Sequence, residues 1–274
     1  MVFGFLGKQD LVDKDTARWL FETFAWSLSN FDAEVFYRET RLVVPSNEYF
    51  PGRENSVEGM ARLIFEHVTR YAGMQHWPFR LMAQTECSVT RPGGVQIRGA
   101  LRGSRASPQG DVNEAQRLIV VYDAALLGNP EALIASYAHA LAHYLGQTAS
   151  QPPPGGTAYW PQATEVLAVF LGFGLMFANS AFFVPVRSCG SCAGPLAQRH
   201  SYLTQYESTY ALAIFSVLKD VESRAVTSRL KKALRPFFRK CMREIQGKQE
   251  ELDRLRSVLA TPTQTVIAGA GELS

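Results

Sequence analysis

One long apolar run limits this chain to two kinds of structure. Residues 166–186 are almost wholly apolar and about as long as a segment that spans a bilayer. A helix that is apolar on all sides also occurs at the centre of a soluble domain. Glu165 precedes the run, and Gly172, Gly174 and Pro185 interrupt it, which argues against a membrane span. We therefore expect a buried central helix and no stable membrane insertion, with a membrane-associated protein as the alternative.

The composition is that of a folded globular protein. Hydrophobic residues make up 46% of the 274 residues and charged residues 19%, enough for a substantial core. The net charge of +3 is too small to indicate nucleic-acid binding, so no nucleic-acid partner is expected. Residues 1–8 lack the features of a signal peptide, and we expect a cytoplasmic protein.

Apolar periodicity and capping residues predict a mostly helical chain with a few strands. Asp15 is placed as the cap of a first helix, and the strands 87–90 and 95–101 are expected to form a hairpin through a Pro-Gly-Gly turn. A β-rich run at 118–122 predicts one more strand. Further helices are expected over residues 56–71, 129–146, 161–178, 201–219 and 222–258, the last with a kink at Pro236.

Two histidines lie four residues apart on the expected helix 129–146. His139 and His143 therefore share one helical face, close enough to bind a single zinc ion. Such a pair also arises by chance in helices that bind nothing. Here two of only five histidines share one helix among small apolar neighbours, which favours a metal site.

The segment His139-Ala140-Leu141-Ala142-His143 resembles the zincin motif HExxH, with Ala140 in place of the glutamate. Short segments such as residues 168–174 and 210–213 resemble sequences of an uncharacterised bacterial group that carries an HExxH signature. This resemblance extends over most of the chain but implies no particular substrate. Zincin membership implies an α+β fold: a mostly helical metallopeptidase domain with a small, mainly antiparallel sheet and an active-site helix. Residues 118–122 would then be the edge strand that pairs with a peptide substrate.

The gluzincin branch of the zincins has its third ligand, a glutamate, on the following helix. The resemblance thus assigns zinc to His139, His143 and Glu165, provided that the two helices pack antiparallel through the Pro-Gly connector. It implies hydrolysis of a peptide bond in a protein or peptide substrate. Tyr210 is a weak candidate for an oxyanion donor, although a core aromatic is the commoner role of such a residue.

Ala140 cannot act as a general base, because alanine has no ionisable group. Positioned proton transfer contributes about 10² to 10⁴ in rate, so this chain is expected to bind zinc with little or no turnover. The intact surroundings favour a single replacement of Glu by Ala in an active peptidase. A natural pseudoprotease, or a partner-binding protein that uses zinc without catalysis, stays open.

The expected organisation is a single domain over residues 1–260, with N-terminal helices and the hairpin in 1–115 and the metal-binding and C-terminal helices in 116–260. Residues 261–274 are expected to form a flexible tail. Cys189 and Cys192 form a lone CxxC, a weak signal for a zinc or redox site. Segment 224–243 holds eight basic and no acidic residues. It could contact an acidic partner, anionic lipid or nucleic acid, although a solvated helix face has the same pattern and is the commoner case.

Overall fold

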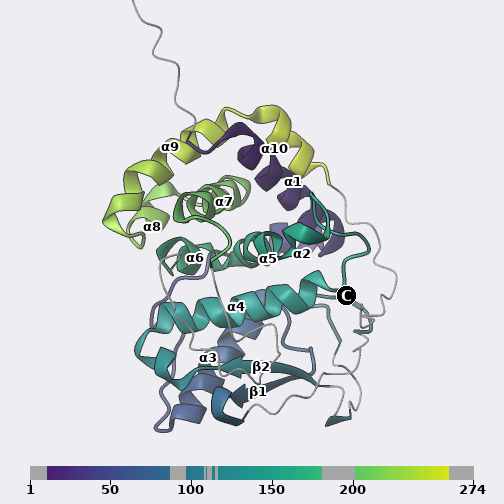
Figure 1. Cartoon of the computed structure of the whole chain (residues 1–274), viewed down its shortest axis with the longest axis vertical. Helices are drawn as coiled ribbons and strands as arrows, with labels where there is room; N and C mark the ends of the chain where they lie inside the picture. The colour runs from purple at the N-terminus through teal and green to yellow at the C-terminus, as the bar shows by residue number, and fades with distance from the viewer. Residues whose placement is uncertain are drawn as a thin grey trace, which may run out of the picture.

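The computed structural model describes residues 11–86, 97–107, 109, 113–114, 117–180 and 201–258. This part of the chain is mostly helical, with one small sheet (Figure 1). Its strands are β1 (Phe79–Ala83) and β2 (Leu118–Tyr122), and its helices are α1 (Lys14–Asn30), α2 (Ala33–Arg38), α3 (Val57–Ala72), α4 (Pro130–Gly146), α5 (Trp160–Ala168), α6 (Gly174–Ser180), α7 (Gln205–Leu218), α8 (Ser223–Thr227), α9 (Arg235–Gln246) and α10 (Gln249–Arg256).

Helix α4 crosses the middle of the molecule and separates two layers (Figure 1). The sheet and α3 pack on one side of it, and α5 and α6 pack on the other. Helix α7 follows α6 outward, with α9 packed against it, while α1 contacts α5, α7 and α10. One hydrophobic cluster runs through these layers and contains residues from Ala17 to Leu255.

The sheet corrects one sequence prediction. Strand 118–122 is confirmed, but its neighbour is β1 and the two strands are parallel, with Phe79 opposite Leu118 and Ala83 opposite Tyr122. The expectation of a mainly antiparallel sheet is therefore wrong for the described strands. Residues 97–101 are not in a strand, and residues 87–90 lie outside the described residues. The parallel arrangement requires the long connection between β1 and β2, which a hairpin would not.

Helix boundaries follow local capping chemistry. The first helix is capped by Asp13 rather than Asp15, because the Asp13 carboxylate accepts a hydrogen bond from the Thr16 amide at 2.9 Å. Ser56 caps α3 in the same way. Thr204 and Glu207 form a capping box, so the helix expected from residue 201 begins at 205.

The region expected to form one long C-terminal helix, residues 222–258, instead forms the α-helices α8, α9 and α10 and a short 3₁₀ helix, Lys232–Leu234. Pro236 lies in the first turn of α9, where its missing N–H leaves no intrahelical bond unmade. The chain therefore starts a new helix at this proline instead of kinking one long helix.

The apolar run is a helix broken by Gly172. Residues Val169–Phe173 form a π-helical segment between α5 and α6, and Gly172 has φ of 102°. Its carbonyl accepts a hydrogen bond from the Val43 amide at 2.9 Å, so the extended segment after α2 lies directly against the helix. A Cβ at Gly172 would lie 2.2 Å from the Arg41 carbonyl oxygen.

We expect Gly172→Ala to lower the free energy of unfolding by about 2 kcal/mol or more. The substitution adds left-handed backbone strain and a backbone clash that no side-chain rotation relieves. Urea unfolding measures the effect. Gly128→Ala is the control, because a Cβ there meets no atom within 4 Å; equal losses in the two variants would contradict this explanation.

The same run, over Thr157–Ser180, is long and apolar enough to cross a membrane by length and composition. Its most apolar window is 94% buried within the fold. The residues of α5, the π segment and α6 pack against α1, α4 and α7. Protein thus covers the surface that lipid would cover in a membrane span.

Candidate metal centre

Helix α4 has the bounds that its sequence predicts. The Asn129 side chain accepts a hydrogen bond from the Ala132 amide at 3.3 Å, and Pro130 occupies the first turn. Small apolar residues then allow close packing on both sides of the helix. Ala138, Ala140 and Ala142 are all fully buried.

His139 and His143 lie one turn apart on α4, and both are half-buried. Ala140 lies beside His139 with no exposed surface. The spacing places both imidazoles on the same stripe of the helix, as the sequence predicts. The stripe continues to Gln147, a residue that the sequence interpretation missed although it repeats the four-residue spacing.

The side chain of His143 is positioned for the neutral form. Burial lowers the pKa of His143 below its usual range. The Gln147 side-chain nitrogen lies 3.0 Å from His143 Nε2, a geometry in which the amide donates and the neutral ring nitrogen accepts. A neutral imidazole is the form that binds metal ions, but its Nε2 already has a partner here.

The lowered pKa of His143 predicts a pH dependence of stability. The unfolded chain takes up a proton on this residue below about pH 6.5, whereas the folded chain resists it, so stability falls as the pH drops through that value. We expect His143→Gln to be less sensitive to acid than the wild type. Urea unfolding at about pH 5 and pH 7.5 measures the difference; identical pH dependence in the two proteins would contradict it.

Glu165 lies on α5, the helix that packs against α4. Its carboxylate has no exposed surface, and it accepts hydrogen bonds from the backbone amides of Tyr202 at 3.2 Å and Leu203 at 2.9 Å. Both donors belong to the segment that leads into α7. A buried carboxylate is stable when N–H groups satisfy its oxygens, so Glu165 connects α5 to the start of α7.

The predicted ligand set is brought together only in part. Its two histidines share one stripe of α4, and its acid lies on the neighbouring helix. Among the residues that the structure describes, however, no three His, Cys, Asp or Glu side chains form a group that could hold a metal ion. The two histidines are therefore better placed to be metal ligands than Glu165, because the Glu165 carboxylate already accepts hydrogen bonds from two backbone amides.

Tyr210 has a partner that the sequence does not suggest. Its hydroxyl donates to the Glu244 carboxylate on α9 at 2.7 Å, and the side chain is fully buried. Burial raises the pKa of Tyr210 well above its usual range. The observed hydrogen bond joins α7 to α9, and Tyr210 as an oxyanion donor stays a prediction without geometric support.

The CxxC pair, Cys189 and Cys192, lies outside the described residues. Cys241 is a buried free thiol on α9, and burial raises its pKa. A buried thiol with a raised pKa is a poor nucleophile and a poor metal ligand.

No protein-family model, curated protein or solved structure matches this chain. The functional interpretation therefore depends on the residues and geometry described above.

Proposed function

We propose that this chain is a catalytically silent zincin-like protein, built on the helix pair of a zinc metallopeptidase but without the residue that drives hydrolysis. The observation that supports the proposal most strongly is Ala140, fully buried beside His139 on the helix that also carries His143. Alanine at this position can neither accept a proton from water nor deliver one to a leaving amine. The protein is expected to act in the cytoplasm.

The two imidazoles would hold the zinc ion, and a bound zinc would supply Lewis-acid chemistry there. In this chain His143 is kept neutral by burial and accepts from Gln147. Ala140 is fully buried and provides no ionisable group next to His139. Glu165 orders the segment before α7 through two amide hydrogen bonds. These roles favour zinc binding without hydrolysis of a peptide substrate.

A second candidate is a metalloendopeptidase silenced by a single Glu-to-Ala replacement. It is favoured by the packing of α5 against α4, which puts Glu165 on the helix next to the histidine helix. The two candidates differ in whether the rest of the site is still competent for hydrolysis.

Ala140→Glu tests both candidates. The wild type is expected to show no zinc-dependent cleavage of denatured casein. A variant that gains cleavage by about 10² or more, abolished by a chelator, would identify a silenced peptidase. A variant that contains zinc and cleaves nothing would identify a non-catalytic protein. In either case, elemental analysis of the purified protein measures its zinc content, with His143→Ala as the control that lacks one histidine.

Ala142→Glu is the matched control for folding. Ala140 and Ala142 are both fully buried on α4 but point to different sides of the helix. A glutamate at 142 is expected to destabilise the fold with or without zinc, since it buries an uncompensated carboxylate. If zinc restores the stability of Ala140→Glu alone, the new carboxylate lies beside the metal. If zinc restores neither variant, the zincin interpretation fails.

A further inference from the structure

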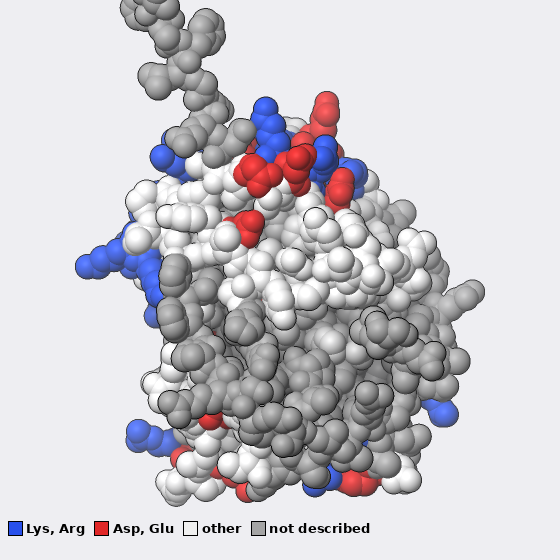
Figure 2. Space-filling view, in the orientation of Figure 1, with Lys and Arg blue, Asp and Glu red and all other residues white. Residues whose placement is uncertain are grey.

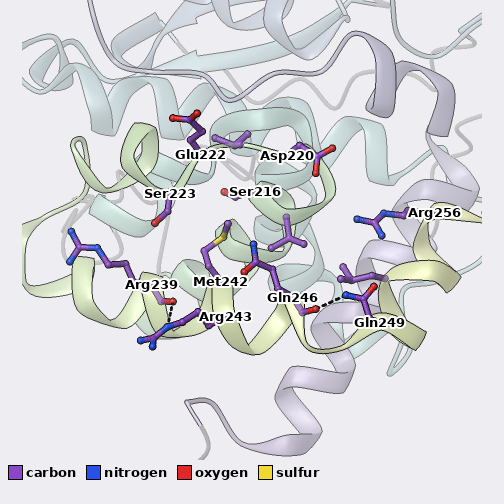
Figure 3. A pocket seen from close by; sticks show the side chains of 13 residues that line it. Ser216, Asp220, Glu222, Ser223, Arg239, Met242, Arg243, Gln246, Gln249 and Arg256 are labelled. Atoms are coloured by element: carbon purple, nitrogen blue, oxygen red, sulfur yellow. Dashed lines mark hydrogen bonds between the residues drawn. The ribbon is translucent and has the colours of Figure 1, made fainter.

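A pocket of about 620 Å³ lies between the end of α7, helix α9 and helix α10 (Figure 3). None of its lining residues belongs to α4 or α5, so it is separate from the histidine site and independent of the proposed function. Its size is in the range of pockets that bind small molecules or a few residues of a peptide.

Arg239 and Arg243 lie one turn apart on α9 and line one end of this pocket (Figure 3). Both are exposed, and neither forms an ion pair with a residue that the structure describes. Arg243 Nε donates to the Arg239 carbonyl, at 3.4 Å. By contrast, Arg38 and Arg62 each pair with a glutamate on their own helix. Two neighbouring guanidinium groups are therefore available for carboxylates.

Between the charged ends the pocket has an apolar floor. Val217, Val221, Met242 and Leu252 contribute to its lining. Arg256 lies toward the other end in the close-up view, and its ion pair with Asp253, at 3.6 Å, is exposed and weak (Figure 3). Methionine adapts its shape to different apolar side chains. The pocket thus offers cations at both ends and an adaptable apolar surface between them.

The surface next to α9 adds positive charge. Lys and Arg side chains project from the edge of the molecule at α8 and the turn into α9, whereas Asp and Glu side chains lie among Lys and Arg at the α10 end (Figure 2). Lys231, Lys232 and Lys240 are exposed and form no ion pair within the described part of the chain. Such a field attracts acidic partners and speeds their encounter with the pocket.

We propose that this pocket binds an acidic peptide segment of a partner protein, with carboxylates on Arg239 and Arg243 and an apolar side chain over Met242. Asp220 and Glu222 also line the pocket. They would repel the uniformly charged backbone of a nucleic acid, whereas a peptide can place uncharged residues beside them. The mixed lining therefore favours a peptide in which acidic and apolar residues alternate.

The test uses a fluorescein-labelled peptide of repeated Glu-Glu-Leu triplets and the full chain, with fluorescence anisotropy as the readout. The wild type is expected to bind this peptide and not a Lys-Lys-Leu analogue. Arg239→Glu with Arg243→Glu is expected to weaken binding by about tenfold or more. The neutral pair Arg239→Gln with Arg243→Gln should also weaken it. Because both arginines are exposed, these variants should keep the wild-type melting temperature.

Lys231→Glu with Lys232→Glu is the matched control. It makes the same change in net charge within the same basic segment but alters no pocket residue. A loss of binding as large as that of the arginine variant would mean a diffuse charge effect and would overturn the proposal. So would absence of peptide binding by the wild type, or displacement of the peptide by oligothymidylate or phosphatidylserine vesicles at lower concentration than by unlabelled peptide.

Discussion

Arg102→Met is expected to lower the free energy of unfolding by about 3–5 kcal/mol, because it removes a buried cation whose hydrogen bonds contribute about 1.5–3 kcal/mol each. Arg102 is 1% exposed, and its guanidinium donates to three separate acceptors: the Ala72 carbonyl at 3.0 Å, the Phe31 carbonyl at 3.3 Å and the Thr40 hydroxyl at 2.8 Å. Burial lowers the pKa of Arg102 to about 10, so the group stays charged at neutral pH.

These contacts connect the ends of α1, α2 and α3, and the guanidinium carbon lies 5.2 Å from the ring centroid of Phe170 in the π segment. Methionine fills similar space but donates nothing, which leaves buried oxygens without their donor. Chemical denaturation measures the loss. Arg105→Met is the control, because Arg105 is exposed and its ion pair with Glu34, at 3.6 Å, is also exposed; it should change stability by about 0.5 kcal/mol or less. Similar losses in both variants would contradict this role of Arg102.

Glu165→Gln is expected to destabilise the protein by about 2–3 kcal/mol, even in the presence of a chelator. The fully buried carboxylate accepts from two backbone amides, and glutamine offers one acceptor oxygen and a donor that would oppose the second amide. Unfolding curves with chelator and with zinc separate this structural role from a role as metal ligand.

If Glu165 does not bind zinc, the loss of unfolding free energy in Glu165→Gln is the same with chelator and with zinc. If it also binds zinc, the wild type gains stability from zinc and the variant gains much less. Glu207→Gln is the matched control, since the Glu207 carboxylate accepts from an amide in the same segment but the residue is only half-buried. Equal stability of the Glu165→Gln and Glu207→Gln variants would contradict a structural role for the buried Glu165 carboxylate.

Local signals in the sequence predicted the histidine helix and strand 118–122 with their observed ends. Asn129, Pro130 and the apolar period fix α4 through interactions within a few residues, which a sequence displays directly. The shared stripe of His139 and His143 follows from helix geometry alone. The buried central helix was also predicted from its composition, although its break at Gly172 was not.

The tertiary structure decided which segments meet. Strand β1 pairs with β2 across a long connection. The Gly172 carbonyl accepts a hydrogen bond from Val43, in the segment after α2. Glu165 accepts hydrogen bonds from amides more than thirty residues away. Likewise, Tyr210 reaches Glu244 on another helix. Capping and periodicity act over one or two helical turns, whereas these contacts depend on how whole helices pack. The sequence by itself therefore determined the histidine pair with Ala140 beside His139, and only the packing of α5 and α7 decided which amides the Glu165 carboxylate accepts from.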